Sequence, residues 1–359
     1  MKCQPLSVLA GLFLLLASRT LRSQESSDAV APVRHEVAIE SAGEGMQRVR
    51  WVEPLDWERE PERLRPLLVS LHSWSSDCDQ IRPQLEQLAA ERGWILIAPD
   101  FQGPNVRPTA CGSEVAQRDI LLAVRWACER FPIDRRRIYL TGVSGGGHMT
   151  MLMVGRYPKI WAGASAWVGI SDLAQWHQEH VGKSRYAENL EAVCRGPYGA
   201  SAAVDRDYQT RSPMAYLHHA AHVPLDIAAG IRDGHRGSVP IHHGIDAFHA
   251  VLRGQGIEPG DEPWVPRAVI DRLSASPDDL PEVLGRDDVW ERDWFLRAES
   301  QETRLTIFEG GHEGIDAGAI EFLETRQLTN PIPLEWLDEP GSEPDFRWWT
   351  DRRAWEEGR

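Results

Sequence analysis

The sequence predicts an α/β protein in which a mostly parallel, eight-stranded sheet is covered by helices on both faces. Short apolar runs alternate along the chain with longer segments whose apolar residues recur at helical spacing. Most of these runs are mainly apolar without a regular alternation, as in strands that are buried on both sides. A length of 359 residues, with 42% hydrophobic and 26% charged residues, suits one large globular domain.

Seven of the strands can be placed on particular segments. The first, residues 46–54, alternates polar and apolar side chains and is expected to be half-exposed. The other six are short, mainly apolar runs, all of them ending in glycine or in an acidic or serine residue. These runs are residues 66–73, 94–100, 137–142, 162–172, 223–234 and 304–314.

Helices are predicted between and after these strands. Residues 84–93 form a helical pattern closed by Gly93, and residues 113–131 begin with Ser113 as a capping residue. Straight-chain residues favour a helix over residues 148–158, which ends near a proline. Two further helical patterns cover residues 240–252 and residues 315–326.

Residues 1–23 are typical of an export signal. Lys2 precedes an apolar run at residues 6–17, which is shorter than the helix needed to cross a bilayer core of roughly 30 Å. An uncleaved membrane anchor is the alternative, because no clear cleavage site follows the run. We expect an exported protein, periplasmic or secreted, with no stable membrane span after signal removal.

The rest of the chain is expected to form a linker, one domain and a tail. Residues 24–33 are a polar linker, residues 34–328 the α/β domain, and residues 329–359 a Pro- and Trp-rich tail that runs over the surface. Within the domain, residues 253–303 are acidic and are interpreted as an insertion. Residues 175–217, rich in charge and aromatics, are expected to cover the carboxyl edge of the sheet.

Net charge and cysteine content restrict the function. A net charge of −15 argues against a nucleic-acid partner, because phosphate binding requires a basic face. Signal removal would leave four cysteines, an even number that permits two disulfides in any of three pairings. The cysteines are Cys78, Cys111, Cys128 and Cys194. No C-x-x-C pair is present, which argues against a zinc ribbon or a thioredoxin-type site.

A glycine cluster lies between a predicted strand and a predicted helix. A dinucleotide-binding fingerprint requires glycine where Ser144 stands, and a P-loop requires Lys where His148 follows the last glycine. Both phosphate-binding hypotheses therefore fail. The remaining pattern is G-x-S-x-G at residues 142–146, in which a serine occupies a sharp strand-to-helix turn above the sheet.

A serine hydroxyl is a weak nucleophile without a base, so this motif predicts an acid and a histidine later in the chain. His312 follows the last predicted strand in a glycine-flanked loop, and Asp233 follows the strand before it. The alternative for His312 is a structural role in filling the loop. The alternative for Asp233 is that it only forms an Asp-Gly turn. Asp172, at the end of another predicted strand, is the competing acid.

The oxyanion hole of such a site requires two backbone donors. One is predicted to be the N–H of Gly145, and the other the N–H of Ser73 or Trp74 in the loop after a predicted strand. His72 in that loop is interpreted as structural. His148 is expected to pack beside the site and not to act as the base.

Two other residue groups offer alternatives. His218 and His222 have the i, i+4 spacing that can hold a metal on a helix, but no carboxylate accompanies them in a known pattern, so no metal site is predicted. Among the 15 tryptophans, Trp74 and Trp176 are the best placed for stacking on sugars. Ordinary packing is the alternative for each of them.

Residues 33–328 resemble the α/β-hydrolase fold. Residues 112–158 look like the catalytic domain of prolyl oligopeptidase-like serine hydrolases, and like secreted feruloyl and acetyl xylan esterases. Residues 230–251 are similar to the acid-bearing segment of such hydrolases and point to Asp233. Two features depart from these families: there is no room for the β-propeller of a full prolyl oligopeptidase, and His72-Ser73 replaces the His-Gly of many esterases.

The resemblance implies hydrolysis through an acyl-enzyme, with no metal or organic cofactor. It assigns Ser144 as the nucleophile, His312 as general base and then acid, and Asp233 as the partner that orients the histidine. The leading hypothesis is an exported serine esterase acting on small-molecule or polysaccharide esters, including acyl and feruloyl groups. The alternatives are a prolyl oligopeptidase-like peptidase or amidase, and a non-catalytic hydrolase fold that binds glycans.

Overall fold

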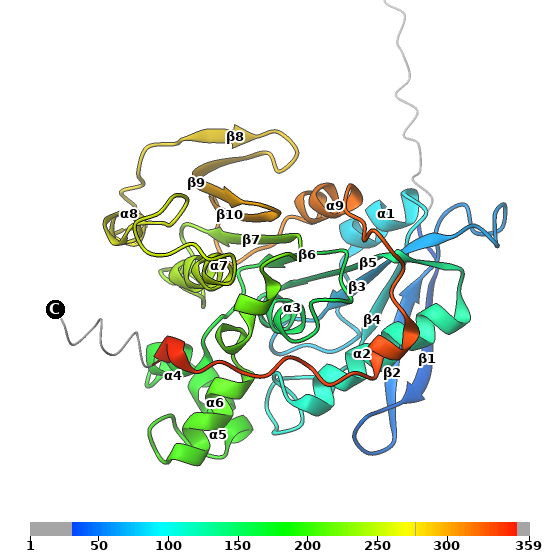
Figure 1. Ribbon diagram of the computed structural model, residues 1–359, viewed down its shortest axis with the longest axis horizontal. Coiled ribbons are helices and arrows are strands. Elements are labelled where there is room, and N and C mark those ends of the chain that lie inside the picture. Colours follow the sequence, from blue (N-terminus) through cyan, green and yellow to red (C-terminus); the bar gives the residue numbers. More distant parts are fainter. Residues whose placement is uncertain (1–30, 277, 350–359) are drawn as a thin grey trace, which may run out of the picture. The chain divides into compact units, whose positions relative to one another are not determined.

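The computed structural model describes residues 31–276 and 278–349, and within them ten strands form one mixed sheet (Figure 1). The strand order is β1-β2-β4-β3-β5-β6-β7-β10-β9-β8. The six central strands, from β4 to β10, are parallel, while β1, β2, β9 and β8 pair antiparallel at the two edges. The predicted fold class is thus confirmed, but the sheet is larger than the predicted eight strands.

The bounds of these elements follow the chain. The strands are β1 (Arg34–Glu40), β2 (Met46–Val52), β3 (Arg65–Leu71), β4 (Ile95–Pro99), β5 (Ile133–Val143), β6 (Gly163–Trp167), β7 (Leu225–Gly230), β8 (Gly285–Asp287), β9 (Arg292–Ser300) and β10 (Thr303–Phe308). The helices are α1 (Pro83–Glu91), α2 (Glu114–Arg130), α3 (Gly145–Arg156), α4 (Leu173–His180), α5 (Arg185–Cys194), α6 (Ala202–Arg211), α7 (His242–Gly254), α8 (Arg267–Leu273) and α9 (Asp316–Glu324). Three short 3₁₀ turns complete the set: η1 (Pro213–Ala215), η2 (Leu217–Ala220) and η3 (Leu334–Leu337).

Seven of the ten strands lie on predicted segments, and β1, β8 and β9 do not. β9 lies within residues 253–303, the segment interpreted as an insertion, and its residues 294–300 pair with β10 and extend the sheet. β9 is only partly buried, with a mixed pattern of charged and aromatic side chains. That pattern gives neither the continuous apolar run of a central strand nor a regular alternation.

Helices cover both faces of the sheet, as predicted. One core joins α2, α3 and α7 to one face of the central strands, and a second, smaller core places α1 and α9 on the other face. β3, β6 and β7 are buried at every position, which explains their mainly apolar sequences.

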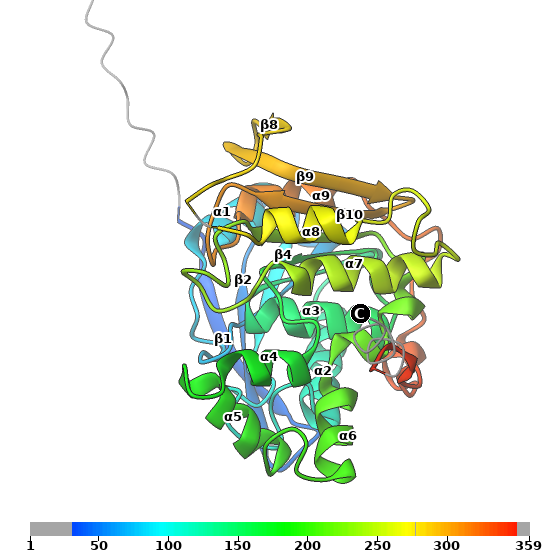
Figure 2. The same cartoon turned by 90° about the vertical axis from the view of Figure 1, so that its left-hand side faces the viewer.

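The segment between β6 and β7 forms a group of three helices, α4, α5 and α6, which lie together below α3 (Figure 2). Their apolar faces join Trp74, from the loop after β3, in one cluster. That loop follows the carboxyl end of a parallel strand, so the helices pack over the carboxyl edge of the sheet, as residues 175–217 were expected to do.

All four cysteines in the described part of the chain are free thiols. The two disulfides that an even number permits are therefore not formed. Cys78, Cys111 and Cys194 are buried, and Cys111 and Cys194 pack in the same cluster as the α4–α6 helices. Burial raises the pKa of the Cys111 thiol to about 12, so these residues serve as small apolar side chains.

The ends of the chain differ in how much can be described. The predicted signal, residues 1–23, and most of the predicted linker lie outside the described residues. Among the described residues no helix has the length and apolar character to span a bilayer.

The segment after α9 runs along α2, where Arg118 and Arg125 donate hydrogen bonds to the carbonyls of η3.

Candidate active site

Ser144 occupies the sharp turn between β5 and α3. Its backbone has φ 60° and ψ −117°, a strained conformation for a residue with a side chain. A Cβ on Gly142 would collide with the backbone of Gly146, and one on Gly146 would collide with the carbonyl of Leu71 in β3. The G-x-S-x-G pattern is thus required by the close crossing of strand and helix, and it raises Ser144 above the sheet.

Three side chains that are distant in sequence form a hydrogen-bonded chain. His312 Nε2 lies 2.8 Å from Ser144 Oγ, and His312 Nδ1 lies 2.7 Å from Asp233 Oδ2. Asp233 comes from the loop after β7 and His312 from the loop after β10, two parallel neighbours whose carboxyl ends meet at the same edge. The structure therefore brings together all three residues predicted as the triad.

The loop around Asp233 holds its carboxylate in place. Oδ1 accepts hydrogen bonds from the backbone N–H groups of Gly234, at 2.9 Å, and Val239, at 3.0 Å. The Asp233 side chain is fully buried, whereas that of His312 is 27% exposed. The competing acid, Asp172, instead accepts hydrogen bonds from Ala174 and Gln175 as the N-cap of α4.

Two backbone N–H groups near Ser144 are suited to bind an oxyanion. A Cβ on Gly145 would lie only 2.5 Å from the Trp74 nitrogen, so the two amides approach closely. Neither N–H has an acceptor among the described residues. The Ser73 N–H, by contrast, donates to Gln80 Oε1 at 2.7 Å, so the structure favours Trp74 over Ser73 as the second donor.

The other histidines near the site are structural, as predicted. His72 stacks on Phe101 and lies within 3.0 Å of two carbonyl oxygens, and burial lowers its pKa. His148 is fully buried in α3, with Nε2 2.9 Å from the carbonyl oxygen of Arg211. Burial lowers the pKa of His148 to about 4, so it is neutral at neutral pH.

The two tryptophans considered for sugar stacking are buried, so the alternative of ordinary packing applies to both. Trp74 is 2% exposed and Trp176 is inaccessible, and their rings contact each other edge to face. The Trp176 indole N–H and the His180 ring both bond the carbonyl of Ser238 at 2.8 Å. The Ser238 hydroxyl in turn lies 3.3 Å from His312 Nε2, a contact that the sequence analysis missed.

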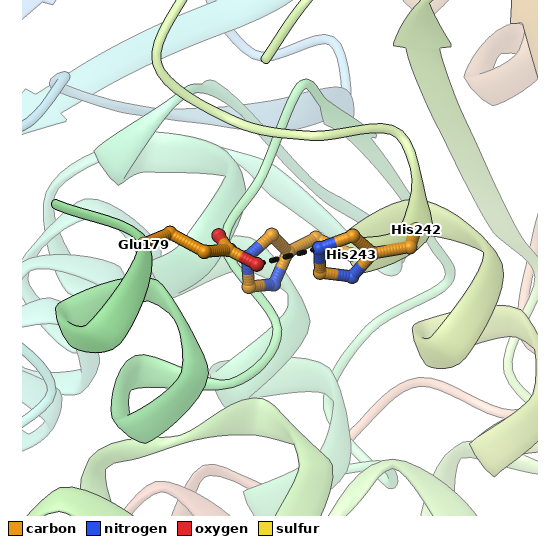
Figure 3. Close-up of side chains that lie close together, drawn as sticks. All are labelled: Glu179, His242 and His243. Carbon is orange, nitrogen blue, oxygen red and sulfur yellow. Dashed lines mark hydrogen bonds and ion pairs between the residues drawn. The ribbon is translucent and has the colours of Figure 1, made fainter. Parts of the chain in front are cut away.

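The histidine pair considered for metal binding does not form a ligand cluster. His218 packs against the ring of His219, and His222 lies 3.3 Å from Gln301. A different cluster, Glu179, His242 and His243, brings its ligand atoms together beside the Asp233 loop (Figure 3). The adjacent histidines just after that loop were the available signal in the sequence.

Comparisons with known proteins agree with this geometry. Residues 83–258 match the model of the prolyl oligopeptidase family, a span that includes Ser144 and Asp233 and ends before His312. The matched residues are therefore similar to a domain of that family, which confirms the resemblance predicted from the sequence and indicates a serine hydrolase.

Two curated esterases match part of the chain. Feruloyl esterase B of Thermothelomyces thermophilus is 27% identical over 30% of this chain and 40% of its own length. An acetylxylan esterase of Coprinopsis cinerea is 28% identical over 29% of this chain and 30% of its own length. The chain thus aligns with less than half the length of either relative.

Solved peptidase structures share the fold. The uncomplexed acylaminoacyl peptidase of Pyrococcus horikoshii superposes with a TM-score of 0.51 at 19% identity, over 64% of this chain and 36% of its own. An acylaminoacyl peptidase in complex with Z-Gly-Gly-Phe-chloromethyl ketone gives a TM-score of 0.50 at 18% identity, over 68% and 40% of the two chains. These similarities establish the α/β-hydrolase fold alone.

Proposed function

We propose that this chain, a serine hydrolase with a prolyl oligopeptidase family domain, cleaves carboxylic esters through an acyl-enzyme on Ser144. The observation that carries the proposal is the continuous hydrogen-bonded chain from Ser144 Oγ through His312 to Asp233. Together with the strained turn at Ser144, this chain has the geometry that nucleophilic acyl transfer requires.

In the first half of the reaction, Ser144 Oγ attacks the ester carbonyl while its proton passes to His312 Nε2. This requires the tautomer in which Nδ1 carries the proton donated to Asp233 Oδ2, as the 2.7 Å contact allows. The buried carboxylate then stabilises the imidazolium that forms. Its other oxygen is held by the Gly234 and Val239 N–H groups, so Asp233 keeps its position throughout.

The negative charge that develops on the carbonyl oxygen falls near the N–H groups of Gly145 and Trp74. Both groups are fixed before the reaction, so little reorganisation is needed as the charge forms. His312 next gives its proton to the departing alkoxide, leaving the acyl group on Ser144. A water molecule, deprotonated by His312, hydrolyses this ester and restores the free serine.

The choice of esters over peptides is supported by the two curated esterases, whose names specify feruloyl and acetylxylan esters. Acyl or feruloyl esters of polysaccharides are the substrates that this similarity favours. The alternative is a peptidase or amidase that uses the same triad. The match to the prolyl oligopeptidase family and the similarity to acylaminoacyl peptidases support amide substrates as strongly as the two esterases support ester substrates.

A substrate panel tests both candidates. We expect turnover of p-nitrophenyl acetate and methyl ferulate, and little or no turnover of proline p-nitroanilide. Ser144→Ala should abolish the ester turnover while leaving the unfolding temperature close to that of the wild type. Ester turnover that survives in Ser144→Ala would refute the mechanism, and a higher kcat/KM for the anilide would favour the peptidase.

The non-catalytic, glycan-binding alternative is less well supported, since Trp74 and Trp176 are buried. Retained glycan affinity in a wild-type protein that hydrolyses none of the panel would favour it.

We also propose export, on the basis of the apolar run at residues 6–17 alone. Expression of the full chain in a Gram-negative host, followed by N-terminal sequencing of the periplasmic protein, should give a shortened product; an intact cytoplasmic chain would refute export.

A further inference from the structure

A cluster of one carboxylate and two imidazoles lies at the start of α7, apart from the hydrogen-bonded chain of the triad. Glu179 extends from α4, and His242 and His243 are the first two residues of α7 (Figure 3). Glu179 Oε1 lies 2.7 Å from His242 Nε2, and Oε2 lies 3.2 Å from His243 Nε2. The ligand atoms of all three residues lie within 4.8 Å of one another.

The outer nitrogen of each imidazole also has a partner. His242 Nδ1 lies 3.4 Å from Asp246 Oδ2, and His243 Nδ1 lies 3.3 Å from both the backbone N and the Oγ of Ser171. A carboxylate or hydroxyl in this position accepts the Nδ1 proton when Nε2 is a metal ligand, and it fixes the ring orientation. At His243 the Ser171 backbone N–H donates to Nδ1, so metal binding there requires the Nδ1-protonated tautomer, with that proton directed at Ser171 Oγ. The side chain of His243 is inaccessible, while His242 and Glu179 are 21% and 24% exposed, which leaves a route from solvent.

We infer that Glu179, His242 and His243 form a binding site for a divalent transition-metal ion, with zinc as the preferred ion. Two imidazole nitrogens and one carboxylate are a donor set that zinc uses in proteins. The Gln175 amide lies 3.0 Å from both Glu179 Oε1 and His242 Nε2. Water would be the fourth donor of such a site.

The charge of the cluster suits a cation. Two carboxylates face the His242 imidazole, Glu179 at Nε2 and Asp246 at Nδ1. Carboxylate groups beside imidazole ligands favour a divalent cation.

A bound ion would connect α4 to the end of the loop that carries Asp233. That loop is already tied to α4, because Trp176 and His180 bond the Ser238 carbonyl. The metal would add a second connection, at the point where the loop enters α7. Its role would thus be to hold the α4–α6 helices and the Asp233 loop in a fixed arrangement, outside the chemistry at Ser144.

Metal binding to the full-length protein tests the inference. Protein treated with EDTA and then freed of the chelator is mixed with Zn²⁺ or Co²⁺ and passed over a desalting column. We expect about one metal ion per chain by elemental analysis, visible absorption from the Co²⁺ form, and a Tm rise of about 5 °C at a metal concentration 100 times Kd. Absence of retained metal and of any Tm shift would overturn the proposal, leaving an ion-pair network only.

Variants locate the site. Glu179→Gln keeps the shape of the side chain and should bind zinc at least tenfold more weakly, and His243→Gln should do the same. The matched control is His218→Gln, which removes a histidine from the pair that forms no ligand cluster and should bind like the wild type. Unchanged binding in both cluster variants, or loss of binding only in His218→Gln, would contradict the assignment. Tm values in EDTA show whether each variant is folded.

Discussion

At the residue scale, glycines fix the geometry around Ser144 as much as the triad does. Gly142 and Gly146 allow the strand and the helix to cross, while Gly145 allows the turn to approach the loop that carries Trp74. The Gly145 contact is the one with a direct chemical consequence. It places two unpaired N–H groups next to each other, and that arrangement is sensitive to a single added methyl group.

We predict that Gly145→Ala lowers kcat by about 10²–10³-fold, the loss that follows removal of one oxyanion donor. The added Cβ would lie 2.5 Å from the Trp74 nitrogen, so the loop must move away from Ser144. Steady-state kinetics with p-nitrophenyl acetate measure the effect. Gly244→Ala is the control, since its Cβ would make an ordinary 3.5 Å contact with Ala229; equal losses in both variants would contradict the explanation.

A second prediction concerns the acid of the triad. Asp233→Asn retains an oxygen for the Gly234 and Val239 N–H groups, so the loop should keep its shape. Its amide, however, donates to His312 Nδ1 and forces the tautomer in which Nε2 carries the proton. His312 can then no longer accept the Ser144 proton, and kcat should fall about 10⁴-fold with little change in Tm.

Asp172→Asn is the matched control for that experiment. Asp172 is the acid that the sequence left as a competitor, and asparagine replaces aspartate well as an N-cap. Its kcat should stay within a few-fold of the wild type. A loss of activity in Asp172→Asn comparable to that in Asp233→Asn would show that the hydrogen bond between Asp233 and His312 is not the one used in catalysis.

The sequence predicted these three residues because each follows a strand that is easy to recognise. It could not separate Ser73 from Trp74 as the oxyanion donor. That choice depends on the Gln80 side chain, which folds back to occupy the Ser73 N–H. The contact between Ser238 and His312 was missed because it too depends on a side chain distant in sequence. Trp176 of α4 donates a hydrogen bond to the Ser238 carbonyl and so fixes the loop that places the Ser238 hydroxyl near His312.

At the element scale, the strands buried on both sides and the alternating strand β2 were predicted, whereas the outer strands β1, β8 and β9 were not. β3 is buried along its whole length, and its sequence shows it. β9 instead satisfies its backbone by pairing with β10, although its side chains are only partly buried. Pairing of this kind depends on a neighbour and leaves no periodic signal in the strand itself.

The buried histidine of α3 gives a prediction about pH. His148 has its pKa lowered to about 4 by burial, against about 6.5 in an unfolded chain. Between these two values the unfolded chain binds a proton that the native protein does not, so stability falls as the pH falls from about 6.5 to about 4. The slope from this residue is about 1.4 kcal/mol per pH unit.

Replacing His148 by Gln should reduce that slope, even if the variant is less stable at pH 7. Urea unfolding at pH 7 and pH 5 measures it. The loss between the two pH values should be smaller in His148→Gln than in the wild type, although His249, whose pKa burial also lowers to about 4, will maintain part of it. His222→Gln, at an exposed position, should behave like the wild type. An unchanged loss in His148→Gln would contradict the explanation.

At the scale of the whole molecule, the parallel core was predictable and the surroundings of the site were not. Seven strands and five helices of the domain follow from apolar patterns. The α4–α6 helices were expected only as a cover over the sheet edge, because their sequence is rich in charged and aromatic residues. Their packing nevertheless determines which cluster of histidines comes together and which tryptophans are buried.

The segment after α9 is the second part of the molecule whose role the sequence understated. It was predicted to run over the surface, yet Ile332 and Leu337 belong to the main hydrophobic core beside α2. The carbonyl oxygen of Leu337 accepts a hydrogen bond from Arg118 at 3.0 Å, and Arg118 also bonds the carbonyl of Asp338. This segment therefore covers apolar surface of the domain and should contribute to its stability.

We predict that Leu337→Ala lowers the free energy of unfolding by about 3 kcal/mol, within the range found for buried leucines. The side chain is 2% exposed, so its removal leaves a cavity that the flanking turn can fill only in part. Urea unfolding followed by tryptophan fluorescence measures the loss. kcat should be unaffected because η3 packs against α2, and no residue of the triad lies on either element. Glu335→Ala, one exposed position in the same 3₁₀ turn, is the control and should change stability by less than about 0.5 kcal/mol. Equal stability of Leu337→Ala and the wild type would mean that the segment is bound to the surface without supporting the domain.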